Sequence, residues 1–111
     1  MGNYGENKAV SFLENYNYEI IERNFFCNKG EIDIIAKKDK EIVFVEVKTR
    51  TSRKYGKPRE AVDFYKKKHI LNTAKYYLYI NNLYNKYIRF DVIEVFLNRN
   101  KVYINHLKNI M

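Results

Sequence analysis

The sequence predicts an α/β protein in which two helices pack on a mixed β-sheet. In several short runs, Ile, Val and Phe alternate with polar residues, which is typical of strands buried on one side. Two longer segments repeat their apolar residues at helical spacing instead. The expected order is one helix, three strands, a second helix and two more strands. With 111 residues, 46% of them hydrophobic, the chain is expected to form a single domain, 1–111, around one core.

The first helix is expected from Gly5 to about Tyr16. Its inward positions, at helical spacing, are Ala9, Phe12, Leu13 and Tyr16. Glu6 falls near this inward face, in the first turn, where an acidic side chain also stabilises the helix dipole. From the residues alone, Glu6 is either such a dipole-stabilising residue or a carboxylate that points toward a functional site.

Three strands with short connections are expected next, and they predict an antiparallel meander. Their ranges are Tyr18–Cys27, Glu31–Ala36 and Glu41–Thr49. The connection between the second and third strands is charged, and Asp39 is its one good turn former.

Charged residues interrupt the apolar runs of the second and third strands. Asp33 lies among isoleucines, and Glu46, Lys48 and Arg50 share one face of the following strand because side chains alternate. A short hairpin can bring Asp33 beside Glu46. Burying unpaired charges costs several kcal/mol each, even after relaxation, so this cost must be offset. Either the acids and Lys48 neutralise one another in a structural cluster, or Asp33 and Glu46 hold a hard cation such as Mg²⁺.

The net charge of +8 is concentrated in one segment of the chain. Residues 48–69 contain nine Lys or Arg and two acids, a net of +7, and the other 89 residues carry a net of +1. A concentrated basic segment is typical of a surface that binds a polyanion such as nucleic acid. The alternative is a solvated loop and helix face.

After a polar loop at Thr51–Pro58, a second helix is expected from Arg59 to about Asn81. Its buried stripe is expected to contain Val62, Ile70, Ala74, Tyr77 and Leu78. Lys66 lies on this stripe, so its ammonium group either reaches solvent past the core or points at the site or a phosphate. His69 is interpreted as a helix-face residue, and Tyr55 and Tyr65 are candidates for stacking on bases.

Two strands close the predicted sheet, at Tyr87–Leu97 and, on its edge, Lys101–Leu107. If the strands on either side of the second helix are parallel, their connection is expected to be right-handed. No apolar run approaches the roughly 20 residues of a membrane span, and no signal peptide is recognisable. The single cysteine, Cys27, fits a reducing compartment, so a cytoplasmic protein that does not enter the membrane is expected.

The order helix-Glu, strand-Asp, strand-Glu-x-Lys, helix resembles the PD-(D/E)XK nuclease superfamily. More closely, the chain resembles the YraN family of small bacterial proteins, which are related to archaeal Holliday junction resolvases. The central matching motifs are G-E-I-D-I-I-A at 30–36 and V-F-V-E-V-K-T-R at 43–50. The other matching positions are Gly5-Glu6, Arg23-Asn24, Gly56, Lys66, Ala74, Arg89-Phe90-Asp91-Val92 and Ile104-Asn105-His106. One departure is Ile32 in place of the proline of the superfamily motif.

The resemblance implies a restriction-endonuclease-like core and a DNA nuclease that depends on Mg²⁺ or Mn²⁺. Asp33 and Glu46 would be metal ligands, Lys48 the catalytic lysine, and Glu6 the first-helix acid of resolvase-like members. A homodimer would suit relatives that cut two strands symmetrically. The basic residues expected to contact DNA phosphates are Arg50, Arg53, Lys54, Lys57, Arg59 and Lys66.

Two other functions fit the same residues. A nucleic-acid-binding module would keep the fold and the basic face without cleaving its ligand. A structural or adaptor protein would use the acids and Lys48 only as a salt-bridge cluster. In that protein Mn²⁺ would not change the melting temperature, and replacing one of the charges would destabilise the fold by about 3–5 kcal/mol.

Overall fold

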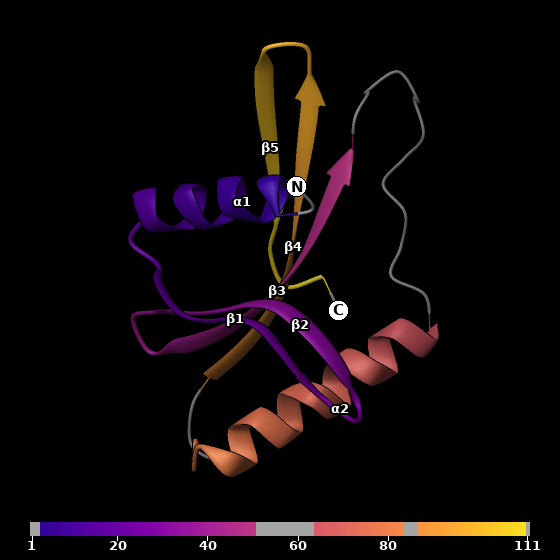
Figure 1. The fold of residues 1–111 in the computed structure, drawn as a ribbon. Helices are drawn as coiled ribbons and strands as arrows, with labels where there is room; N and C mark the ends of the chain where they lie inside the picture. The colour runs from indigo at the N-terminus through magenta and orange to yellow at the C-terminus, as the bar shows by residue number, and fades with distance from the viewer. Residues whose placement is uncertain (1–2, 51–63, 84–86, 111) are drawn as a thin grey trace.

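A five-stranded mixed sheet and two helices make up the fold, as the sequence predicts (Figure 1). The structure, a computed structural model, describes residues 3–50, 64–83 and 87–110. The elements are α1 (Tyr4–Asn15), β1 (Glu19–Cys27), β2 (Gly30–Lys38), β3 (Glu41–Arg50), α2 (Phe64–Ile80), β4 (Tyr87–Asn98) and β5 (Lys101–Leu107). The predicted strands agree with these bounds to within two residues. The expected beginning of the second helix, at Arg59, lies outside the described residues.

The strands follow their sequence order across the sheet, β1-β2-β3-β4-β5. All neighbours are antiparallel except β3 and β4, which are parallel and joined through α2. The meander and the edge position of the last strand are therefore confirmed, and the condition for a crossover connection, a parallel β3–β4 pair, is met. This arrangement is consistent with the restriction-endonuclease-like core that the sequence suggests.

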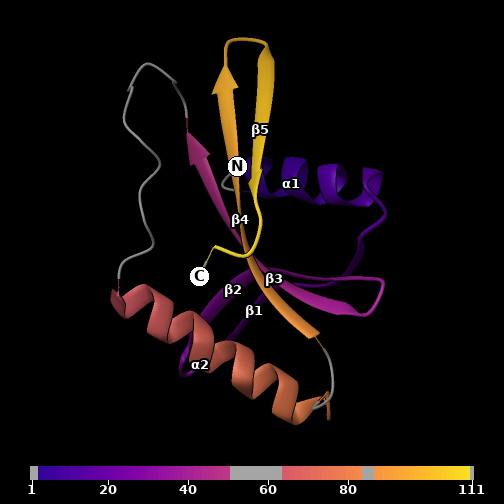
Figure 2. The same cartoon turned by 180° about the vertical axis from the view of Figure 1, so that it is seen from behind.

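The two helices cover opposite faces of the sheet (Figures 1 and 2). On one face, Ala9 and Leu13 of α1 pack against a cluster that contains Ile34, Ala36, Val43, Val45, Ile93 and Val95. Phe12 is partly buried beside this cluster. Tyr16 was expected on the inward stripe, but it follows the end of α1 and is 57% exposed.

The α2 face carries the second apolar cluster. Ile70, Ala74 and Tyr77 of α2 pack there against Ile32, Ile35, Ile42, Phe44 and Val92. These helix positions belong to the predicted buried stripe, and Leu78 is partly buried beside them. Val62, the first expected member, lies outside the described residues. The even-numbered residues of β3, which include Glu46 and Lys48, thus face the same side as α2.

The beginning of α1 lies against the end of β3. A Cβ atom at Gly5 would come within 2.0 Å of the Thr49 Oγ1 atom, so only glycine allows this approach without a shift. The close contact places Glu6, the next residue, beside the half of β3 that carries the charged motif. No helix in the described part of the chain is long and apolar enough to cross a membrane.

Candidate metal and nucleic-acid site

Asp33 lies where the pairing of β2 with β3 ends. The paired residues run from Lys38 opposite Glu41 to Ile34 opposite Val45. Beyond that point the Val47 N–H donates to the Asp33 Oδ2 atom at 2.8 Å, in place of a backbone carbonyl. Strict alternation also fails here, since Ile32 and Ile35, three residues apart, pack in the same cluster. This local break in the ladder directs the Asp33 carboxylate toward β3.

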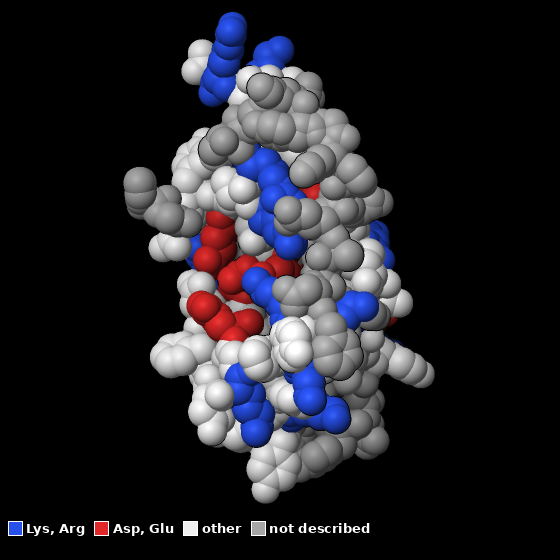
Figure 3. Space-filling view, turned by 90° about the vertical axis from the view of Figure 1, so that its right-hand side faces the viewer, with Lys and Arg blue, Asp and Glu red and all other residues white. Residues whose placement is uncertain are grey.

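Glu46 and Asp33 line one hollow between the sheet and α2. The hollow has a volume of about 370 Å³ and is lined by Gly30, Glu31, Asp33, Glu46, Tyr65, Lys66 and His69. Glu46 is buried, and its Oε2 atom lies 2.6 Å from the Lys66 Nζ atom. Figure 3 shows the corresponding side of the molecule, where acidic side chains gather and Lys and Arg side chains lie directly beside them. The predicted proximity of Asp33 and Glu46 is therefore present in the fold.

The acid pair is held together against its own repulsion. Burial raises the pKa of Asp33 from 3.8 to about 6, and the negative charge of Glu46 adds to the rise. The hydrogen bond from Val47 opposes this effect, and Glu31 and Glu6 add smaller increases. The raised pKa means that nearby positive charge does not stabilise the ionised form of Asp33 enough to offset burial and Glu46, although Lys66 lies close to Glu46.

Lys66 supplies a cation to this pair through its contact with Glu46, and we expect the Lys66→Met variant to reveal the repulsion between the acids. Without metal, its free energy of unfolding should fall by about 0.5–1 kcal/mol, because the lysine is half exposed and the ion pair is screened. Added Mn²⁺ should raise its melting temperature more than that of the wild type, since the Lys66 ammonium group no longer competes for Glu46. Thermal unfolding with chelator and with Mn²⁺ measures both effects.

Lys68→Met is the matched control, because Lys68 is exposed on the same helix and does not line the hollow. It should respond to Mn²⁺ as the wild type does. Equal Mn²⁺ responses in the Lys66 and Lys68 variants would contradict a competition between Lys66 and metal.

Glu6 is buried but is turned toward β1. Its Oε2 atom accepts from the Arg23 Nε atom at 2.8 Å and from the Asn24 Nδ2 atom at 3.2 Å. Arg23 also donates to the Asn7 side chain at 2.6 Å. Glu6 does not appear among the described residues that line the hollow. Its effect on the pKa of Asp33 nevertheless places it within electrostatic reach of the acid pair.

Lys48 and Arg50 continue the same face of β3. Lys48 is partly buried, lies opposite Glu94 of β4 in the parallel register, and is not among the described residues that line the hollow. The Arg50 Nη2 atom lies 3.7 Å from the Glu94 Oε2 atom. The remaining residues expected to bind phosphate, Arg53, Lys54, Lys57 and Arg59, lie outside the described residues.

The carboxylates of Asp33 and Glu46 fit a hard divalent cation most of whose other ligands are water and substrate oxygens. In the part of the chain that the structure describes, no group of three or more His, Cys, Asp or Glu side chains forms a metal cage. Mg²⁺ is commonly bound by one or two carboxylates, with water and substrate phosphates completing its shell. Asp33 and Glu46 can supply those two carboxylates.

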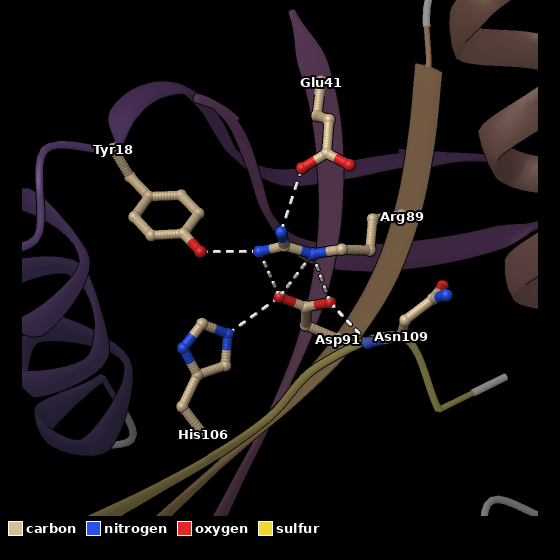
Figure 4. A network of polar contacts seen from close by, with 6 residues as sticks. All are labelled: Tyr18, Glu41, Arg89, Asp91, His106 and Asn109. Carbon is tan, nitrogen blue, oxygen red and sulfur yellow. Dashed lines mark hydrogen bonds and ion pairs between the residues drawn. The ribbon is translucent and has the colours of Figure 1, made fainter. Parts of the chain in front are cut away.

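Two buried acids of β4 were not recognised in the sequence as parts of a charged network. Glu94 is 3% exposed and accepts from the Asn105 Nδ2 atom at 2.9 Å. On the other face, Asp91 contacts both Arg89 and His106 (Figure 4). The sequence did offer one signal for these acids: each is a charged residue in an otherwise apolar strand that contains Val92, Ile93 and Val95. Their partners, however, depend on strand pairing that the sequence does not specify.

Comparison with known proteins gives concordant matches over most of the chain. A family model described as "Uncharacterised protein family UPF0102" matches residues 5–95. A UPF0102 protein of Clostridium perfringens is 53% identical over 111 residues, covering 98% of this chain and 91% of the relative. One from Caldicellulosiruptor bescii is 51% identical over 112 residues, covering 98% and 94%. A third, from Clostridioides difficile, is 50% identical over 108 residues, covering 97% and 93%.

Proposed function

The chain belongs to UPF0102, the YraN family, and from this premise and the geometry of the acid pair we propose that it is a metal-dependent DNA nuclease. The observation that carries the proposal is that the Asp33 and Glu46 carboxylates line one hollow, and the raised pKa of Asp33 supports it. Perturbed carboxyl groups in a hollow are typical of functional sites. A bound divalent cation would remove their repulsion, and it is the partner that a carboxylate pair selects.

The proposal gives each residue of the site a role. Asp33 and Glu46, on adjacent strands, would hold the cation. The chemistry that bound Mg²⁺ or Mn²⁺ supplies is an acidified water and a polarised scissile phosphate. Lys48, on the same face of β3, orients the attacking water or takes its proton and offsets the charge that develops on the phosphoryl group. Glu6 adds negative potential that favours the cation.

The basic segment supplies affinity for the DNA backbone. Lys66 lines the hollow, Arg50 contacts Glu94 further along β3, and Arg53, Lys54, Lys57 and Arg59 complete the basic segment in the sequence. Phosphate contacts of this kind give binding that weakens with salt and carries little base specificity. The resemblance to resolvase-like nucleases favours structured or branched DNA in repair or recombination as the substrate.

The experiment that tests the proposal is cleavage of labelled DNA by the wild type and the Glu46→Gln variant. Single-stranded, duplex, flap and four-way-junction substrates are each incubated with Mn²⁺ or with chelator. We expect cleavage that requires metal and falls at least about 100-fold in the variant, since even residues that only orient metal ligands contribute about 10- to 100-fold. Binding without cleavage on every substrate would instead identify a non-catalytic nucleic-acid-binding module.

A further inference from the structure

Tyr65 presents a large aromatic surface at the edge of the hollow that contains the acid pair. Its side chain is 73% exposed although it lines the same hollow as Asp33 and Glu46. His69, one turn later on α2, is also exposed and lines the hollow. The wall opposite the acids therefore offers two ring systems on successive turns of a helix.

The position of Tyr65, rather than its exposure, distinguishes it from other tyrosines of α2. Tyr79 is 66% exposed on the same helix, yet it lies 14 residues further along and outside the lining of the hollow. Tyr76 is 39% exposed and stacks on Phe25 of β1. Among the α2 tyrosines whose surroundings the structure describes, Tyr65 is the one that lies beside the two acids.

An exposed aromatic ring at this position can attract DNA although the acidic side chains of the hollow repel its phosphates. Glu31, Asp33 and Glu46 line the hollow, and their charges repel a phosphate backbone when no cation is bound. Stacking of a nucleobase on an aromatic side chain provides attraction that does not depend on charge. Lys66, the next residue, lines the same hollow and contacts Glu46.

We propose that Tyr65 is a stacking platform for one unpaired nucleobase, so that the site takes DNA with single-stranded or locally unpaired nucleotides. This inference rests on the proposed nuclease function and specifies its substrate class. Inside a duplex, both faces of a base are covered by its neighbours, so a protein ring can stack only on a base outside that stack. A base stacked on Tyr65 would lie at the hollow that Asp33 and Glu46 also line.

Binding of labelled oligothymidylate and of a duplex of the same length, both with chelator, tests the proposal without cleavage. The Tyr65→Leu variant should bind the single strand about 5- to 100-fold more weakly and the duplex within about twofold of the wild type. Tyr65→Phe keeps the ring and should bind as the wild type does. Tyr79→Leu, the matched control, should also be unchanged.

A single-stranded probe that contains 2-aminopurine reports stacking directly, because its fluorescence is quenched when the base stacks. Quenching should occur with the wild type and Tyr65→Phe and be lost with Tyr65→Leu. Unchanged single-strand affinity in Tyr65→Leu, or an equal loss for duplex, would overturn the inference. Neither result would affect the nuclease proposal, which is decided separately by metal-dependent cleavage and the Glu46→Gln variant.

Discussion

The Asp33→Asn variant is expected to lose metal-dependent DNA cleavage and, without metal, to be more stable than the wild type at neutral pH. The loss of cleavage should be at least about 100-fold, because one of two protein ligands no longer carries charge. DNA binding should be kept or tightened, since a negative charge leaves the hollow. The amide can still accept the hydrogen bond from the Val47 N–H, so the shape of the site is retained.

The gain in stability follows from the raised pKa of Asp33. Its pKa is about 6 in the folded protein, against an ordinary value of 3.8, so the folded state binds the proton more tightly than the unfolded chain does. The contribution of this carboxyl to stability is therefore greatest below pH 3.8 and is lost as the pH rises through about 6. At pH 7 the asparagine variant should gain about 1–3 kcal/mol, with allowance for solvent screening.

Urea unfolding of both proteins from pH 4 to pH 7, with chelator, measures this difference. The two stability curves should separate as the pH rises, and the separation should shrink when Mn²⁺ is added to the wild type. Glu31→Gln is the control, because Glu31 lines the same hollow but is exposed and has a smaller effect on the pKa of Asp33. It should keep cleavage and change stability by less than about 0.5 kcal/mol.

The same experiment separates the metal site from a structural salt-bridge cluster. In such a cluster each charge is needed by its partners, and Asp33→Asn would destabilise the fold by about 3–5 kcal/mol. The raised pKa of Asp33 predicts the opposite sign. A destabilised variant that still cleaves DNA would therefore refute both the assignment of Asp33 and the electrostatic argument for it.

Local patterns in the sequence were sufficient for the strands and for the acid pair. Alternation defined β2 and β3, and the short turn at Asp39, which adopts a φ of +55°, fixed a hairpin in which Asp33 comes close to Glu46. Helical spacing likewise placed Ile70 and Ala74 in the core. These features depend on residues that are near one another in the chain, which is why periodicity and turn chemistry predict them.

Contacts between distant segments were not predictable in the same way. Glu94 lies opposite Lys48 only because β3 and β4 pair in one particular parallel register. The bond between Glu6 and Arg23 joins residues 17 positions apart and depends on how α1 crosses the sheet. The departure of β2 from strict alternation at Ile32 also has no signal in the sequence, yet it accompanies the turn of Asp33 toward β3.

Replacing Asp91 with asparagine should cause the largest loss of stability among the substitutions considered. Its side chain is fully buried on the α1 face of β4 and receives hydrogen bonds from three directions (Figure 4). Arg89 donates to Oδ2 at 2.9 Å, the His106 Nε2 atom lies 2.7 Å from the same oxygen, and the Asn109 N–H donates to Oδ1 at 2.8 Å. Arg89 in turn contacts Glu41 and the Tyr18 hydroxyl group.

The charge of Asp91 is what these partners require. Burial alone would raise its pKa, but the hydrogen bonds from His106, Arg89 and Asn109 outweigh burial and hold the pKa below 3.8. Its contribution to stability is therefore present above pH 3.8 and is lost at lower pH, opposite to that of Asp33. An amide removes the buried counter-charge of the Arg89 guanidinium and leaves it only the more exposed Glu41 carboxylate, which should cost about 3–5 kcal/mol.

Urea unfolding at pH 7 measures this loss, and Asp39→Asn is the control. Asp39 is exposed in the turn between β2 and β3 with a positive φ, a conformation that asparagine also tolerates, so its stability should change by less than about 0.5 kcal/mol. Adding Arg89→Met to Asp91→Asn should recover part of the loss, because the guanidinium that has lost its buried counter-charge is then removed. If Asp91→Asn cost less than about 1 kcal/mol, or if the second substitution gave a purely additive loss, the network would not anchor β4. Because β4 is the parallel partner of the strand that carries Glu46 and Lys48, its anchoring on the α1 face also fixes the strand on which the candidate site is built.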